Sequence, residues 1–196
     1  MKKLITTALV TGLVLALGAG FAQPFAPDAE HGVTIQIPDV LFLRITDGTD
    51  NEAVTGTVVN FDFASTDAAI NEYLDWVDGG GGWIGSTDDV DAFGDVIVFS
   101  NRDGWSVTVV ATAFATAGFS LDNVQVEPSG TLNLATANIA GSWTLSTTLE
   151  SIASNGARTQ GWKSLGFSAG DYAINLDGTE EPGTYETLVT YTIAQP

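Results

Sequence analysis

The sequence predicts an all-β protein, an antiparallel sandwich of the Greek-key or jelly-roll kind, over residues 33–196. Short runs rich in β-branched and aromatic residues recur along the chain, and turn-forming pairs separate them, among them Asp47-Gly48, Asp103-Gly104 and Asn155-Gly156. Many short strands punctuated by such turns are typical of sandwiches. No internal repeat or second domain is evident, so we expect one domain.

The first three predicted strands occupy the segment before residue 64. Val33–Ile37 alternates apolar and polar residues and stops at Pro38. Val40–Ile45 is a short run that ends in a turn-forming stretch, and Val54–Phe63 is β-branched and aromatic. Alternation at every second residue is the sign of a half-buried strand.

Six further strands are predicted after residue 95. Val96–Phe99 is apolar throughout, which is typical of a strand buried on both faces. The others alternate or are short apolar runs between turns. They are Trp105–Ala113, Val124–Val126, Trp143–Leu149, Tyr172–Leu176 and Tyr185–Ile193.

One short helix is predicted at residues 67–77. Its apolar residues recur at helical spacing, and Asp67 is placed to cap its N-terminus. The glycine run 79–82 ends it. Residues 79–95 are rich in Gly and Asp, and we expect them to form a long surface loop.

The first 22 residues have the layout of a secretory signal peptide. Two lysines precede an uncharged apolar run over residues 4–20, and Gly20-Phe21-Ala22 puts small residues at the cleavage positions. We therefore expect residues 1–22 to be removed, 23–32 to be an extended leader, and the protein to be secreted and associated with the cell envelope. No later segment is apolar for long enough to span a membrane, so none is expected once the signal is removed.

The exported chain, residues 23–196, would be strongly acidic. It keeps all 24 acidic residues and four of the six basic ones, which gives a formal charge of −20. Such a surface repels nucleic acid and anionic lipid, so we expect no nucleic-acid partner. The absence of Cys excludes disulfides, and with a single His it also excludes the usual zinc sites.

Three acidic clusters are candidate calcium sites, because calcium binds oxygen ligands on flexible loops. The alternative is that these carboxylates are simply solvated. The clusters are Asp88, Asp89, Asp91 and Asp95; Asp47, Asp50 and Glu52; and Asp177, Glu180 and Glu181. No other cofactor is predicted.

No catalysis is predicted. Residues 166–170 read Gly-Phe-Ser-Ala-Gly, the pattern of a serine-hydrolase turn, but no helix is predicted after Ser168 and the only histidine, His31, lies upstream. We interpret the motif as a turn between strands. A glycosidase needs only two suitably spaced carboxylates, and the sequence leaves that alternative open.

Tryptophans supply the candidate binding residues. Trp76 and Trp83 flank the glycine run and Trp162 lies in a polar stretch, so all three are candidates for stacking on sugar rings. Trp105 and Trp143 alternate with small polar residues on predicted strands, which favours packing in the core.

Two motifs lie in the chain from Asp103 onward. The first is Gly-Trp-Ser-Val-Thr-Val at 104–109, and the second is the closing strand 183–196. With them the chain resembles the WxL domain, a cell-wall-binding module of bacterial surface proteins, with Val107 in place of the family's first Leu and with Tyr191 and Ile193 in place of its second Trp and Leu. The resemblance implies an envelope-associated β-sandwich with Trp105 and Tyr191 as paired anchor positions.

The predicted function is therefore non-covalent binding of cell-wall glycan by a non-catalytic surface protein. Its partners would be cell-wall polysaccharide or other envelope proteins. The alternative is a structural subunit of a fibre or layer, assembled by strand exchange, because the last strand runs almost to Pro196 and the leader is loose.

Overall fold

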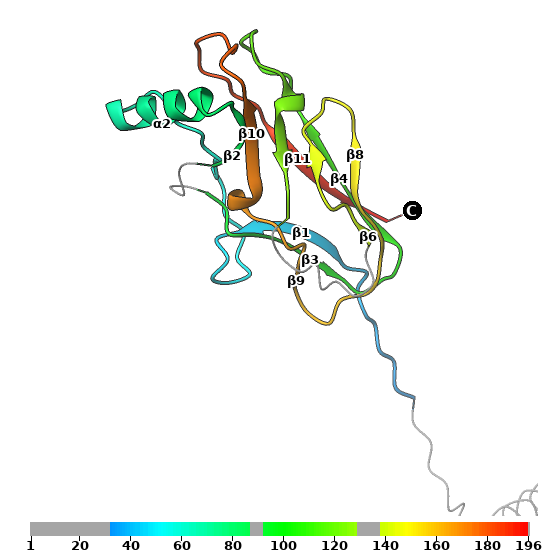
Figure 1. The fold of residues 1–196 in the computed structure, drawn as a ribbon. Helices are drawn as coiled ribbons and strands as arrows, with labels where there is room; N and C mark the ends of the chain where they lie inside the picture. Colours follow the sequence, from blue (N-terminus) through cyan, green and yellow to red (C-terminus); the bar gives the residue numbers. More distant parts are fainter. Residues whose placement is uncertain (1–31, 87–91, 129–137, 196) are drawn as a thin grey trace, which may run out of the picture. The chain divides into compact units, whose positions relative to one another are not determined.

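The computed structural model describes residues 32–86, 92–128 and 138–195, and the chain divides into two units, Met1–Pro38 and Asp39–Pro196 (Figure 1). The described part of the first unit has no regular secondary structure. The predicted strand Val33–Ile37 is thus wrong, since it pairs with no strand among the described residues. Its apolar side chains, Val33, Ile35 and Ile37, are 72%, 78% and 78% exposed. Alternation supplies the pattern of a strand, but a strand also needs a hydrogen-bonded neighbour.

The described residues of the second unit form three antiparallel sheets, which confirms the predicted fold class. The first has the order β1 (Leu41–Thr46), β3 (Asp95–Ser100), β9 (Lys163–Ser164). The second has the order β2 (Gly82–Gly85), β10 (Tyr172–Leu176), β5 (Val124–Val126), β7 (Trp143–Thr144). The third has the order β11 (Val189–Ala194), β4 (Trp105–Ala111), β8 (Glu150–Gly156), β6 (Asn138–Ile139). Neighbours in each sheet are distant in sequence, as in a sandwich-like fold. In Figure 1, β1 and β3 run crosswise to β4 and β10.

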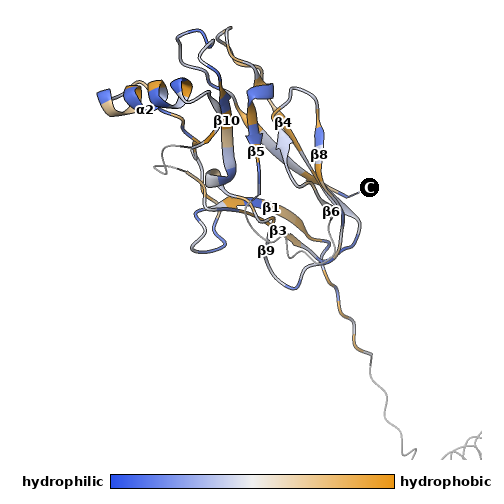
Figure 2. Ribbon diagram, viewed as in Figure 1, coloured by the Kyte–Doolittle hydropathy of each residue, from blue (hydrophilic) through white to orange (hydrophobic). Residues whose placement is uncertain are grey.

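The core lies on the inner faces of these sheets. Along β4, the residues at every second position, from Trp105 to Ala111, are buried, and those between them are half-buried. Strand β3 is buried on both faces at Val96, Ile97 and Val98, as its continuous apolar run predicts. Figure 2 shows the hydrophobic colouring of β1 and β3.

Three predicted strands differ from the structure in extent. Val54–Phe63 forms no strand, although Val59, Phe61 and Phe63 pack against the core from irregular backbone. Of Trp143–Leu149 only β7 is a strand, and the closing strand begins at Val189 rather than Tyr185. Strand β8, which is polar and small (ESIASNG), was not predicted. Backbone pairing with a neighbour decides these bounds, and the local pattern does not encode that neighbour.

The helix α2 (Asp67–Asp78) confirms the predicted helix with one correction at its start. Thr66 is the N-cap in place of Asp67, and its Oγ1 accepts from the Ala69 N–H at 3.1 Å. Two short 3₁₀ turns, η1 (Leu121–Asn123) and η2 (Ala169–Asp171), precede β5 and β10. In the described part of the chain, no helix is long and apolar enough to cross a membrane.

Strand β2 lies inside the segment predicted to be a surface loop. It pairs with β10, with Ile84 opposite Ile174. The glycine run before it permits this approach: a Cβ on Gly81 would stand 2.2 Å from the Leu176 carbonyl oxygen, and Gly81 has a φ of +67°. The glycines therefore allow close backbone contact and do not simply form a loop.

Candidate ligand-binding surface

Trp105 is a core residue and offers no face to a ligand. It is 1% exposed, and its Nε1 donates to the Ala157 carbonyl at 2.8 Å. The interpretation of Trp105 and Trp143 as core residues is confirmed, since Trp143 is buried as well. The anchor role that the resemblance implied for Trp105 is incompatible with this burial.

Tyr191 also belongs to the core through its phenol. Its hydroxyl is hydrogen-bonded to the hydroxyl of Tyr172, and its ring centroid lies 5.4 Å from that of Phe167. Phe167 in turn makes an edge contact with Trp143 at 5.1 Å. Tyr191 lies opposite Val109, so it is four positions along β4 from Trp105, about 13 Å of strand. The two proposed anchors share a face but do not meet.

This buried tyrosine pair makes stability sensitive to alkali. Burial raises the pKa of Tyr172 to about 12, and burial with the neighbouring Tyr172 raises the pKa of Tyr191. Unfolded tyrosines ionise near pH 10, so the contribution to stability is complete below about pH 10 and is lost as pH rises toward 12. For Tyr172 alone the loss is about 2–3 kcal/mol.

Denaturant titrations at about pH 9 and about pH 11.5 measure this loss. The double variant Tyr172→Phe/Tyr191→Phe removes both hydroxyl groups together, so it leaves neither unpaired. It is expected to lose clearly less stability between the two pH values than the native chain. An equal loss would show that other groups cause the alkaline sensitivity.

The other three candidate tryptophans lie on three different segments: α2, β2 and the residues directly before β9. Trp76, on α2, packs against the core, and its Nε1 donates to the Gly82 carbonyl at 3.4 Å. Trp83, on β2, is 40% exposed and makes no ring contact with another aromatic side chain among the described residues. Trp162, directly before β9, is half-buried and belongs to an aromatic cluster.

That cluster covers the outer face of the β1-β3-β9 sheet. Phe42 and Phe99 are direct cross-strand neighbours, and their ring centroids lie 6.4 Å and 5.7 Å from that of Trp162. Phe42 is 54% exposed. Ile97 lies on the same face and is only 4% exposed, so larger side chains cover it. We call Phe42, Phe99, Trp162 and Arg44 the aromatic platform.

Arg44 fixes the platform and gives it a positive charge. Its guanidinium lies 4.4 Å from the Trp162 ring centroid, a cation–π distance, and Nη1 donates to the Asn51 carbonyl at 2.6 Å. Within the described ranges, the other two arginines, Arg102 and Arg158, are paired with aspartates, whereas Arg44 has no carboxylate partner. A highly acidic protein thus keeps an uncompensated arginine at an aromatic surface.

Sequence reasoning identified Trp162 but missed the rest of the platform. Phe42, Phe99 and Arg44 lie on predicted strands, where side chains alternate between core and solvent. Only the register Phe42↔Phe99 and Arg44↔Ile97 brings them together on one face. The signal present in the sequence is that Phe42 and Arg44 are two residues apart and so share a face of their strand.

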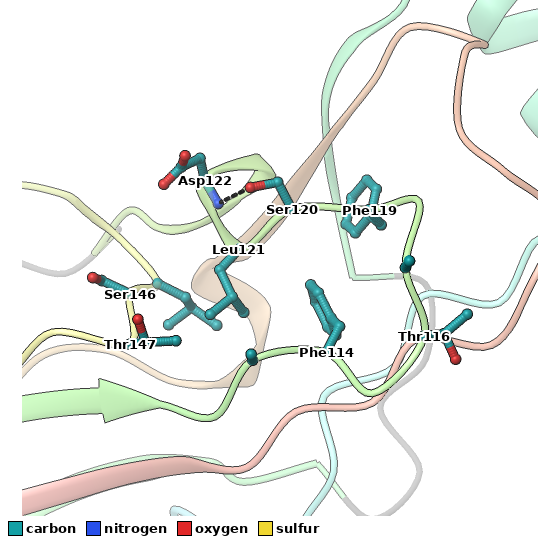
Figure 3. Close-up of a pocket in the computed structure, with 11 residues that line it drawn as sticks. Phe114, Thr116, Phe119, Ser120, Leu121, Asp122, Ser146 and Thr147 are labelled. Atoms are coloured by element: carbon teal, nitrogen blue, oxygen red, sulfur yellow. Dashed lines mark hydrogen bonds between the residues drawn. The ribbon is translucent and has the colours of Figure 1, made fainter.

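A second feature is an open hollow of about 340 Å³ at the loops that follow β4 (Figure 3). Figure 3 shows Phe114 and Phe119 on one wall, with ring centroids 5.7 Å apart, and Thr147 on the other. The Ser120 hydroxyl accepts from the Asp122 N–H, so it is already engaged. The hollow has the size of a small ligand site.

Carboxylates of two acidic clusters accept hydrogen bonds from groups within their own loops. Asp47 Oδ1 accepts from the N–H and hydroxyl of Thr49, and these bonds lower the pKa of Asp47. Glu180 accepts from the N–H groups of Asp177 and Gly178 and from the Tyr73 hydroxyl. No group of three or more metal-ligating side chains is found in the described residues. Asp88, Asp89 and Asp91 lie outside the described residues, so calcium binding stays a prediction.

The Gly-Phe-Ser-Ala-Gly motif forms the turn into β10, as expected. Ser168 precedes the 3₁₀ turn η2, and both its N–H and its hydroxyl donate to Asp171, at 2.7 Å and 3.2 Å. Phe167 within the motif is buried in the core. The serine thus serves the turn, and His31 lies outside the described residues.

Comparison of the chain with protein families, curated proteins and solved structures finds no match.

Proposed function

We propose that this is an exported, non-catalytic protein of the cell envelope that binds cell-wall polysaccharide through the aromatic platform. The observation that carries the proposal is the exposed Phe42 ring beside Trp162 and Arg44, on the outer face of one sheet, where Arg44 has no carboxylate partner among the described residues. The signal-peptide pattern and the resemblance to a wall-binding module support the location. Trp105 and Tyr191 have no part in the contact.

The chemistry of the platform suits a sugar chain. The apolar face of a pyranose stacks on an aromatic ring, which Phe42 presents to solvent, and Arg44 retains guanidinium N–H groups that can donate to sugar hydroxyls. The formal charge of −20 on residues 23–196 opposes the approach of polyanions. We therefore expect the preferred polysaccharide to carry little net charge.

Sedimentation with insoluble cell-wall material tests this proposal. Purified residues 23–196 should sediment with the wall, and Phe42→Ala and Trp162→Ala should each weaken binding about tenfold, the loss of one ring contact of about 1.4 kcal/mol. Trp83→Ala is the matched control, because it removes an exposed tryptophan from a different sheet. Thermal melts of all variants verify that the fold is intact.

Three results would overturn the proposal that the aromatic platform binds polysaccharide. The native protein could fail to sediment, or Trp83→Ala could lose as much binding as Trp162→Ala. Binding could also be unchanged in both platform variants but lost in Phe119→Ala, which would place the ligand in the hollow instead.

A further inference from the structure

The segment Val33–Ile37 has the composition of a strand but pairs with no strand among the described residues. Valine and isoleucine at positions 33, 35 and 37 alternate with Thr34 and Gln36, no residue of the segment is charged, and Pro38 ends it. The three apolar side chains are more than two-thirds exposed. An uncharged, β-branched segment of this kind is a ready donor for strand addition.

Strand β11 is an incomplete edge of matching length. Among the described residues it is hydrogen-bonded to β4 on one side and to no strand on the other, since the sheet order begins with β11. On β4 the inward residues Val107, Val109 and Ala111 are buried, whereas their partners on β11 are only half-buried. Those partners are Ile193, Tyr191 and Val189. The inner face of the sheet is thus less well covered at this edge than one strand further in.

We propose that Val33–Ile37 of one copy adds to the open edge of β11 in a second copy, so that the protein assembles into chains of subunits. In the antiparallel sense that all strand pairs of the described residues share, Ile35 lies opposite Tyr191. Val33 and Ile37 then extend the half-buried row formed by Ile193 and Val189. Thr34 falls opposite Thr192, on the outer face.

This pairing would provide hydrogen-bond partners for the backbone of both strands and would bury the apolar side chains of the donor segment. The added backbone supplies donors and acceptors to the edge of β11 that has no hydrogen-bonded strand in the described residues, and three apolar side chains leave water. The contact is head-to-tail, because the donor segment and the acceptor edge are different surfaces, and such contacts form open chains when they do not close into a ring. Assembly of this kind does not depend on polysaccharide binding by the platform.

Electrostatic repulsion between the acidic subunits opposes assembly, and salt screens this repulsion. Each exported copy carries a formal charge of −20, while the donor segment is uncharged. The screening length shrinks from about 30 Å at 0.01 M salt to about 8 Å at 0.15 M. We therefore expect the mass measured by light scattering to rise with salt over this interval.

Disulfide trapping tests the register directly, and the chain offers a background without cysteine. In residues 23–196, the double variant Thr34→Cys/Thr192→Cys should form a ladder of covalent oligomers under mild oxidation, because opposed residues of an antiparallel pair lie within disulfide range. Thr34→Cys/Thr144→Cys is the matched control: Thr144 is an exposed threonine on the edge strand β7. It should give no ladder.

Two substitutions that each introduce a negative charge then test whether the apolar face of the segment is buried on assembly or whether added charge alone prevents assembly. Ile35→Asp should abolish salt-induced assembly, whereas Thr34→Asp, with the same charge on the outward side, should retain it. Neither residue belongs to a strand of the folded unit, so both variants are expected to melt like the native chain.

The proposal is overturned if the native chain stays monomeric at high concentration and at all salt concentrations. It is also overturned if Thr144→Cys cross-links as well as Thr192→Cys. Oxidation of Thr34→Cys/Thr192→Cys to a disulfide-bonded monomer would show that the segment pairs within its own chain.

Discussion

Replacement of Trp105 by alanine is expected to destabilise the protein by about 3–5 kcal/mol. Among the described residues the indole is the largest fully buried side chain, at 1% exposure, so its removal leaves a cavity that the surrounding sheets can fill only in part. The variant also loses the hydrogen bond from Nε1 to the Ala157 carbonyl. In a domain of this size the melting temperature should fall by about 10 °C or more.

Trp83→Ala is the control for the Trp105 substitution. It removes the same side chain from a position that is 40% exposed, and its effect on the free energy of unfolding should be much smaller. Calorimetry or denaturant titration of the two variants gives the comparison. If both lost the same stability, the burial of Trp105 would be refuted. A Trp105→Ala variant that fails to bind cell wall therefore reports on folding and says nothing of the ligand contact.

Gly156→Ala is expected to destabilise the protein by about 2–3 kcal/mol through overpacking. Gly156 lies directly opposite Trp105 in the β4–β8 pair. A Cβ at position 156 would stand 1.9 Å from a ring carbon of Trp105, so the indole or the backbone has to move. Both are held by the surrounding core and by the Gly104 N–H bond to the Gly156 carbonyl at 2.6 Å.

A double-mutant cycle ties this cost to the indole. In the Trp105→Ala background the added methyl group enters space that the ring has left, so Gly156→Ala should cost less than about 1 kcal/mol there. Gly141→Ala is the control for a glycine replacement as such, since a Cβ at 141 meets no atom within 4 Å. If the two substitutions were additive, the clash would not be the cause.

The sequence predicted individual elements well where one local signal was enough. The apolar run of β3, the alternation of β4 and the helical spacing in α2 are encoded within a few residues. Val54–Phe63 carries the same composition as a strand but packs from irregular backbone, and β8 is a strand despite polar and small residues. In both cases pairing partners far along the chain decide the outcome.

The candidate site, like the fold, could be predicted from the sequence only in part. Trp162 could be named from its polar surroundings, and core packing could be expected of Trp105 from its alternation. The neighbours that make Trp162 a platform could not be named, because Phe42 and Phe99 are 57 residues apart in the sequence and meet only through the β1–β3 register. A side chain on a strand faces either core or solvent, and pairing decides which strand shares that face.

By itself, the sequence determined that this protein is acidic, free of cysteine and composed largely of short antiparallel strands, because composition and alternation are local properties of the chain. Only the tertiary structure decided that the Tyr191 hydroxyl meets that of Tyr172, that Phe42, Phe99 and Trp162 meet outside, and that Val33–Ile37 pairs with no strand among the described residues. The physical reason is that hydrogen-bonded partners and packed neighbours are set by register between distant strands, and register is a property of the whole fold.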